Sequence, residues 1–403
     1  MLRYELKKVF SKFKNRMAVA LLFVLLVVVS LLTMNRVYYT KEDGNHISGF
    51  SAAKSLREDQ NKWKGYLTDQ VFQEVLEENT SINNSKEALS ADIDEQDKAY
   101  AKKQGISGIA ALINSAFSEW RDYNYYAIDG LTPQEVTQVY EKRVALLREW
   151  LDSGEERFSD AQKDFLITRY ENLDTPFYYE YVEGWSALLQ SISTYLLILA
   201  LVIGFLVSGI FSDEFLTKAD SIFFSSKLGR NRAIVSKLWA GFLITTGIYV
   251  VFAALYTFIV LSLLGGDGAG CPIQLDLWRS VYNITFFQAY LFIVAGGYVG
   301  ALFAALLSMI VSAATHSTAT ATMVPFIVLC AFPFLSRIIT LPEICSFFPD
   351  QLLDVYNSVK EFDLVEIGGK VMGVVEVIIP VYFLACLVLQ PLLYRVYKRA
   401  EIK

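Results

Sequence analysis

The sequence predicts an all-α membrane protein with six transmembrane helices and an α-helical extracellular domain. Three observations lead to this prediction: six long apolar stretches, one acidic insert between the first stretch and the other five, and helix-start signals that recur inside the insert. An apolar run of about 20 residues is the length that a helix needs to cross a hydrocarbon core of about 30 Å. A chain of 403 residues that is 54% hydrophobic and 19% charged fits such a division between lipid and water.

The apolar stretches divide the chain into three parts. We expect spans at about 18–34, 186–211, 234–264, 286–312, 321–341 and 374–394. Residues 1–34 would form a cytoplasmic amphipathic helix and the first span, residues 35–185 the extracellular domain, and residues 186–403 a five-helix bundle. In the amphipathic start, apolar residues share one helical face with Lys and Arg opposite, which is typical of a helix on the cytoplasmic lipid surface. A disordered basic tail is the alternative.

Charge is distributed unevenly along the chain. Residues 35–185 contain 17 of the 36 Lys and Arg and 28 of the 42 Asp and Glu, a net charge of −11. The remainder therefore has 19 basic and 14 acidic residues, a net charge of +5, and its basic residues gather before span one, between spans two and three, and after span six. Lys and Arg near short loops prefer the cytoplasmic side, so we expect both termini in the cytoplasm and the insert outside the cell membrane.

Helix-start signals predict that the insert is helical. Thr132, with Pro133 and Glu135 after it, is typical of an N-cap with a capping box, Ser159 with Gln162 repeats the box, and the stretch from Asn84 to Glu87 is a weaker third. Apolar residues at helical spacing follow the first signal, namely Val136, Val139, Tyr140, Val144, Leu147 and Leu151. We therefore expect a small helical domain rather than a β-sandwich.

Aromatic residues are dense at two places in the insert. The groups are Trp120, Tyr123, Tyr125 and Tyr126, then Phe177, Tyr178, Tyr179, Tyr181 and Trp185. One interpretation is core packing with an interfacial belt where the domain meets the membrane. The other is a surface that grips a cationic or amphipathic substrate. Paired carboxylates and Ser/His/Asp sets do not stand out, so we expect no catalytic residues.

Cysteine and histidine offer few candidates for chemistry. Cys271 and Cys345 fall in two different expected outside loops, where an oxidising exterior permits a disulfide. Two unpaired thiols are the alternative, because the sequence does not set the separation of the two residues. His46 and His316 are the only histidines, so we expect neither a metal site nor a cofactor in this chain.

The loop between spans two and three, residues 212–233, carries the pattern that points to a family. Its residues of interest are Asp213 and Glu214 directly after span two, then Lys218, Ser225, Ser226, Gly229 and Arg230, with Lys237 opening span three. Together with the basic start, the single first span and the large insert, this pattern resembles the permease subunits of type-two ATP-binding-cassette exporters. The resemblance implies that the loop forms a coupling helix and that these residues dock on a separate ATPase subunit.

The same resemblance implies the partners. Two ATPase subunits would close on ATP and rock two permeases, which are either two copies of this chain or this chain and a related one. A phosphate-binding loop of the form G-x-x-x-x-G-K-[ST] does not occur in the sequence, so ATP and magnesium would bind in the partner and this chain would not itself be an enzyme. We expect an ATPase subunit, a second permease and the lipid membrane as partners, and no nucleic acid.

Small residues mark span four as a packing helix. Gly296, Gly300 and Ala304 lie at helical spacing and let another helix approach closely, either within the chain or across a dimer or substrate path. Glu376 lies near the outer end of span six, where it can reach water. Charged residues are otherwise scarce in the spans, which argues against a channel or a proton-driven carrier.

The function expected from these patterns is that of a permease subunit that exports an amphipathic or hydrophobic cargo. An antimicrobial peptide or a drug is a candidate cargo, because the acidic insert suits a cationic molecule. One alternative is a membrane-anchored sensor or adaptor, although no sizeable cytoplasmic output domain is present. The other is a secondary transporter, which usually shows internal inverted repeats.

Overall fold

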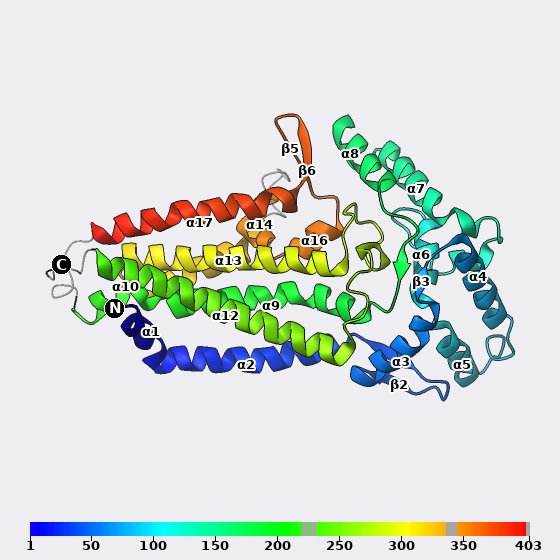
Figure 1. Cartoon of the computed structure of the whole chain (residues 1–403), viewed down its shortest axis with the longest axis horizontal. Coiled ribbons are helices and arrows are strands. Elements are labelled where there is room, and N and C mark those ends of the chain that lie inside the picture. The colour runs from blue at the N-terminus through cyan, green and yellow to red at the C-terminus, as the bar shows by residue number, and fades with distance from the viewer. Residues whose placement is uncertain (220–224, 226–230, 336–344, 400–403) are drawn as a thin grey trace.

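The computed structural model of the chain describes residues 1–219, 225, 231–335 and 345–399. Figure 1 shows a bundle of long helices with a second, mostly helical body at one end of it. The N-terminus, the end of α10 and the end of α17 lie at the opposite end of the bundle, which we call the terminal end. The end that carries α3 to α8 is called the insert end.

Membrane-length helices form the bundle. Their bounds are α2 Phe13–Met34, α9 Glu183–Val207 continued by α10 Gly209–Leu216, α12 Arg232–Leu264, α13 Phe286–Thr315 and α17 Val374–Lys398. Each of these five stretches is long and apolar enough to cross a membrane, as in a multi-pass membrane protein. The expected fifth span, 321–341, overlaps α14 Thr318–Leu335, whose apolar part is shorter than that of the five membrane-length helices. The last residues of this expected span, 336–341, lie outside the described residues.

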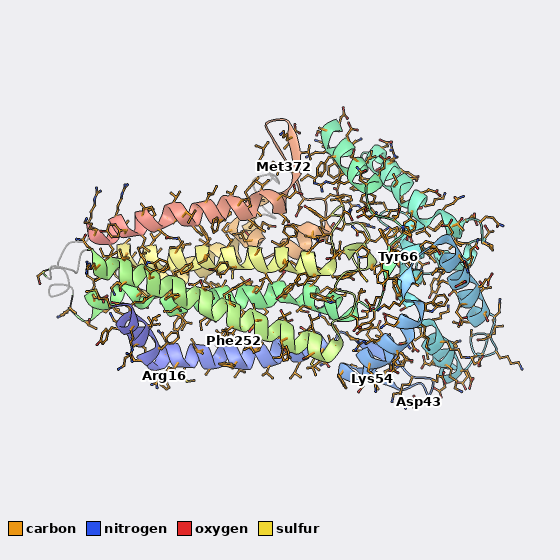
Figure 2. The ribbon with its side chains drawn as sticks, in the orientation of Figure 1. Arg16, Asp43, Lys54, Tyr66, Phe252 and Met372 are labelled. Carbon is orange, nitrogen blue, oxygen red and sulfur yellow. The ribbon has the colours of Figure 1, made fainter. Side chains whose placement is uncertain are left out.

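α13 lies at the centre of the bundle and packs against α9, α12, α14 and α17. Close approach depends on glycine: a Cβ on Gly297 would lie 2.6 Å from Leu196 of α9 and 2.7 Å from the Tyr249 hydroxyl of α12. The Tyr249 hydroxyl donates to the carbonyl of Val294 at 2.7 Å. Farther out, Phe252 of α12 contacts Phe23 of α2 with ring centroids 4.8 Å apart, and Phe252 is labelled in Figure 2.

The insert consists of short helices, two-residue to three-residue strands and their connections. The helices are α3 Phe50–Gln60, η1 Asn61–Trp63, α4 Asp69–Asn83, α5 Ile93–Lys103, α6 Ser107–Ala116, η2 Ala127–Gly130, η3 Val136–Gln138, α7 Val139–Ser153 and α8 Asp160–Glu171. The strands pair antiparallel, β1 Tyr38–Thr40 with β2 His46–Ser48 and β3 Gly65–Tyr66 with β4 Tyr178–Tyr179. Figure 2 labels Asp43, Lys54 and Tyr66 in this body, whereas Arg16 lies in the bundle.

Two connections between bundle helices also lie at the insert end. The first, between α12 and α13, contains η4 Ile273–Leu275. The second, between α14 and α17, contains η5 Pro349–Leu352, α16 Val355–Lys360 and the hairpin of β5 Leu364–Ile367 with β6 Lys370–Gly373. At the terminal end, α1 Leu2–Ser11 precedes α2.

The helix-start signals have mixed outcomes. The capping box of Ser159 is confirmed at the start of α8. Thr132 and Glu135 exchange the expected capping bonds, but a 3-10 turn intervenes and the α-helix begins at Val139. The signal from Asn84 to Glu87 is wrong: the Ser85 hydroxyl accepts from the Ala88 amide in an isolated turn, which ends before the apolar periodicity needed for a helix can develop.

Most of the second aromatic group is buried, and so is Trp120 of the first group. Phe177, Tyr179 and Trp185 are buried, as the core-packing interpretation requires, whereas Tyr125 and Tyr126 are 74% and 72% exposed. The apolar core of the insert also includes a residue from outside it, because Trp278 of the α12–α13 connection packs into the same cluster. The core of the insert therefore includes part of a connection that no pattern in the sequence predicts to lie there.

Candidate functional site

Buried charged groups gather at the terminal end of the bundle. Lys237, in the second turn of α12, has no exposed surface. Its ammonium donates to Glu214 Oε1 of α10 at 2.7 Å, to Glu5 Oε2 of α1 at 3.1 Å and to the carbonyl of Ile210 at 2.7 Å. One lysine thus joins the amphipathic start, the end of span two and the beginning of span three.

The two carboxylates at the end of span two each have a lysine partner from the N-terminal segment. Glu214 Oε1 also accepts from Lys8 Nζ at 2.7 Å, and Asp213 pairs with Lys12. Gly209 opens α10 beside the second pair, and a Cβ there would lie 3.0 Å from Lys12 Nζ. We call Glu5, Lys8, Lys12, Asp213, Glu214 and Lys237 the ionic network.

The break between α1 and α2 explains why the lysines reach the bundle. Lys12 has an extended backbone (ψ 130°) that ends α1 and turns the chain into α2. Asn15, which is buried, donates through Nδ2 to the free carbonyl of Val9 at 2.9 Å and so stabilises the turn. Glu5 and Lys8 are three residues apart and therefore share one helical face, with Lys12 one turn further on.

Because the ionic network is largely buried, breaking one of its ion pairs would be strongly destabilising. Removing one partner of a buried ion pair leaves an uncompensated charge and costs about 3–5 kcal/mol in proteins. Lys237 forms ion pairs with two carboxylates, so replacing it with an uncharged residue would remove one ion pair from Glu5 and one from Glu214. The network therefore fixes α1, α10 and α12 relative to one another at the two edges of the connecting loop.

The predicted coupling residues fall into three groups. Asp213, Glu214 and Lys237 are brought together in the network. Lys218 is exposed just after α10 in a left-handed conformation (φ 56°), and Ser225 is also exposed. Ser226, Gly229 and Arg230 lie outside the residues that the structure describes.

Two parts of the sequence interpretation need correction here. Asp213 and Glu214 were expected on a surface that docks a partner, but they are only 7% and 6% exposed because lysines bind them. The amphipathic start was expected to turn its basic residues away from its apolar face, whereas Lys8 and Lys12 reach carboxylates of α10. Glu5, Lys8 and Lys12 were missed as site residues, and their spacing on one face of a basic helix was the available signal.

The glycines of span four pack inside the chain. A Cβ on Gly296 would lie 2.6 Å from Val355 Cγ2 and 2.8 Å from the carbonyl of Leu352, and one on Gly300 would lie 3.2 Å from Leu353. The segment that contains η5 therefore covers this face of α13. Ala304, one turn further along α13, is buried as well.

The remaining predicted residues are placed as follows. Cys271 and Cys345 are both buried and both free thiols, so the structure has no disulfide between them. Glu376, at the start of α17, pairs with Arg169 of α8 at 3.2 Å and is about one-third exposed, so it joins the insert to α17. Among the described residues, no cluster of His, Cys, Asp and Glu could hold a metal ion.

A different kind of buried charge lies at the insert end. Arg143 of α7 is 2% exposed and donates to the carbonyls of Trp278 at 2.9 Å and Ser280 at 3.1 Å. Its guanidinium also lies 4.0 Å from the ring centroid of Tyr170. Burial lowers the pKa of Arg143 below its usual value, since no carboxylate in the described parts of the chain pairs with it.

Asp276 adds a buried carboxylate at this same junction. Burial raises the pKa of its carboxyl above the usual value, and its Oδ2 atom has no hydrogen-bond partner in the described chain. The connection between α12 and α13 is thus attached to the insert through Arg143. At Asp276 the same connection carries a carboxyl whose ionised form is disfavoured by burial.

An apolar groove of about 360 Å³ opens on the side of the bundle between α12, α13 and α17. It is lined by Val235, Leu238, Trp239, Phe242, Thr245, Leu302, Ala305, Leu306, Met309 and Gln390. Trp239 and Phe242 are 54% and 37% exposed, so the groove faces the surroundings of the bundle rather than its core. Its walls suit the apolar part of a ligand.

Comparison of the chain with protein-family models, with curated proteins and with solved structures found no match to any of them.

Proposed function

We propose that this chain is the transmembrane permease subunit of an ATP-driven exporter, powered by a separate ATPase subunit. In this proposal α14 completes a set of six spans, the terminal end faces the cytoplasm, and the insert lies outside the cell membrane. The loop between α10 and α12 would dock the ATPase, and a second permease, identical or related, would complete the assembly.

The observation that carries the proposal is the ionic network. A loop that transmits force needs both of its ends fixed to the spans that must move. Glu214 lies at the end of span two and Lys237 near the start of span three, and the two side chains are in direct contact at 2.7 Å. Displacement of the loop would therefore move α10, α12 and, through Glu5 and Lys8, α1 as one unit.

Charge and shape support the same arrangement. Basic residues gather at the terminal end, as expected for a cytoplasmic face, and the acidic insert is at the other end. The apolar groove between α12, α13 and α17 supports an amphipathic or hydrophobic cargo, with an antimicrobial peptide or a drug as candidates.

The test is to purify the tagged chain from its native membrane in mild detergent and to identify what accompanies it. We expect a stoichiometric soluble ATPase with the unaltered chain. The double variant Lys218→Glu and Arg230→Glu should lose the ATPase, because reversing two loop charges opposes docking on a complementary surface.

The matched control is the double variant Lys86→Glu and Lys142→Glu, which makes the same two charge reversals at exposed positions of the insert. This control should retain the ATPase in full. A chain that keeps its own oligomer but purifies without any ATPase would contradict the proposal and favour a sensor or a secondary transporter.

A further inference from the structure

A cavity of about 360 Å³ lies between α9, α14 and the segment that contains η5. We call it the Asp350 cavity; it is lined by Ser193, Thr194, Leu197, Leu329, Asp350, Gln351, Leu353 and Asp354. It thus combines two carboxylates, two hydroxyls and one amide with three leucine side chains. Neither the ionic network nor the apolar groove includes any of these residues.

One carboxylate of this cavity is buried without a full set of partners. Asp350 is 7% exposed, and its Oδ1 atom has no hydrogen-bond partner in the described chain. Its other oxygen, Oδ2, accepts only from Gln351 Nε2 at 3.2 Å. Across the cavity, the buried Oγ of Ser193 likewise has no partner among described residues. A carboxylate oxygen, which only accepts, and a hydroxyl, which can also accept, therefore border one space and neither has a hydrogen-bond partner among described residues.

The cavity lies deep in the bundle rather than at its rim. Ser193 is ten residues into α9, about 15 Å from the start of that helix at 1.5 Å per residue. Leu353 contacts Gly300, which lies about 20 Å along α13 by the same measure. A carboxylate at such depth is costly unless a positive charge accompanies it, and intramembrane carboxylates are functional candidates for this reason.

The chemistry of the lining selects one class of ligand. A primary ammonium group has three donors and no acceptor, which matches Asp350 Oδ1 and Ser193 Oγ. Asp354 contributes further negative charge, and its Oδ1 already accepts from Asn357 at 2.8 Å. The leucine side chains form an apolar wall that can contact the apolar part of the molecule to which the ammonium group is attached. A divalent metal fits poorly, because no cluster of three or more typical ligands occurs in the described residues.

We propose that the Asp350 cavity binds an organic cation, a primary ammonium group on an apolar body, with Asp350 as its counter-ion. This proposal rests on the export function for one point only, that the bound cation is cargo. Binding itself is a property of this chain and is measured without an ATPase.

The experiment uses the full chain in lipid nanodiscs with phenethylammonium as the probe and phenethyl alcohol as its neutral counterpart. We expect saturation-transfer NMR to detect the ammonium compound and not the alcohol, and the ammonium compound to raise the melting temperature by several degrees. Asp350→Asn should weaken this binding at least tenfold. The same variant should melt no lower than the unaltered chain in the absence of probe, because it removes an unpaired buried charge.

Two further variants keep the test decisive. Glu361→Gln neutralises an exposed carboxylate of the same connection and should leave binding unchanged. Ser193→Leu fills the cavity from α9 while keeping Asp350, so it should abolish binding even if Asp350→Asn does not fold. Equal binding of the alcohol, or unchanged ammonium binding in Ser193→Leu, would overturn the proposal. Neither result would alter the purification test of the ATPase, so the two proposals fail separately.

Discussion

The two ends of the bundle hold buried charge in different ways. At the terminal end Lys237 pairs with carboxylates from two other elements, in addition to the carbonyl of Ile210. At the insert end Arg143 is bound by backbone carbonyls and lies against aromatic rings. Carbonyls and rings cannot be neutralised or exchanged, whereas an ion-pair network can be rearranged. The difference suggests a permanent joint at the insert and a junction able to transmit movement at the terminal end.

The largest expected effect comes from breaking the network on one side only. Lys237→Met should lower the free energy of unfolding by about 3–5 kcal/mol, because Glu5 would lose its ion-pair partner and the buried Glu214 would keep only Lys8. The double variant Lys237→Met and Glu214→Leu should be less destabilised than the single variant. Thermal unfolding in detergent measures both, and a double variant that is worse than the single one would contradict the pairing.

Arg143→Leu should have the next largest effect, about 2–4 kcal/mol. The variant removes two hydrogen bonds from a charged donor and leaves the carbonyls of Trp278 and Ser280 without it. Limited proteolysis should then cut the insert before the bundle. Because the partners are uncharged, the loss should be insensitive to salt, and a strong dependence on salt would contradict the comparison.

These two sites show what sequence reasoning can and cannot predict. The long apolar helices agree with the expected spans to within a few residues, because the bilayer imposes length and composition locally. The capping box of Ser159 was predicted for the same reason, because all of its atoms lie within four consecutive residues. In contrast, Lys8 and Glu214 are 206 residues apart, and Arg143 and Trp278 are 135 apart. Pairs at such separations depend on how the helices pack, which no local pattern encodes.

The segment at η5 illustrates the same limit. Small residues at 296 and 300 predicted a close approach to α13, and the partner in the structure is the end of the short 3-10 helix η5, at Leu352 and Leu353. Polar backbone at this depth is tolerated because it is buried in protein. The expected spans end at 341 and resume at 374, which leaves this segment in an outside loop, and Asp350 was missed for that reason.

Asp276→Asn should stabilise the protein modestly at neutral pH. Burial raises the folded-state pKa of this carboxyl above its unfolded value, so its favourable contribution is complete below the unfolded pKa and is lost as pH rises through the folded pKa. The variant cannot ionise and should escape that loss. Melting temperatures of the two proteins should converge in acid, and a constant difference at every pH would exclude this cause.

The smallest effect is expected at the exposed pair of Arg169 and Glu376. Both side chains are more than a third exposed, and exposed pairs contribute about 0–1 kcal/mol. Arg169→Gln should therefore shift the melting temperature little, and high salt should remove even that shift. A loss comparable to that of Arg143→Leu would show that this pair, and not the buried arginine, attaches the insert.

The most direct test of the account is hydrogen exchange in the complex of the chain with its co-purified ATPase, with and without a non-hydrolysable ATP analogue and magnesium. The unaltered chain should change its exchange in the loop at 217–231 and also in α1 and the first turns of α12. Glu214→Gln, which weakens the junction while leaving the loop surface intact, should confine the change to the loop. An equal spread of the change into α1 and α12 in this variant would contradict the claim that the ionic network carries movement from the loop to the spans.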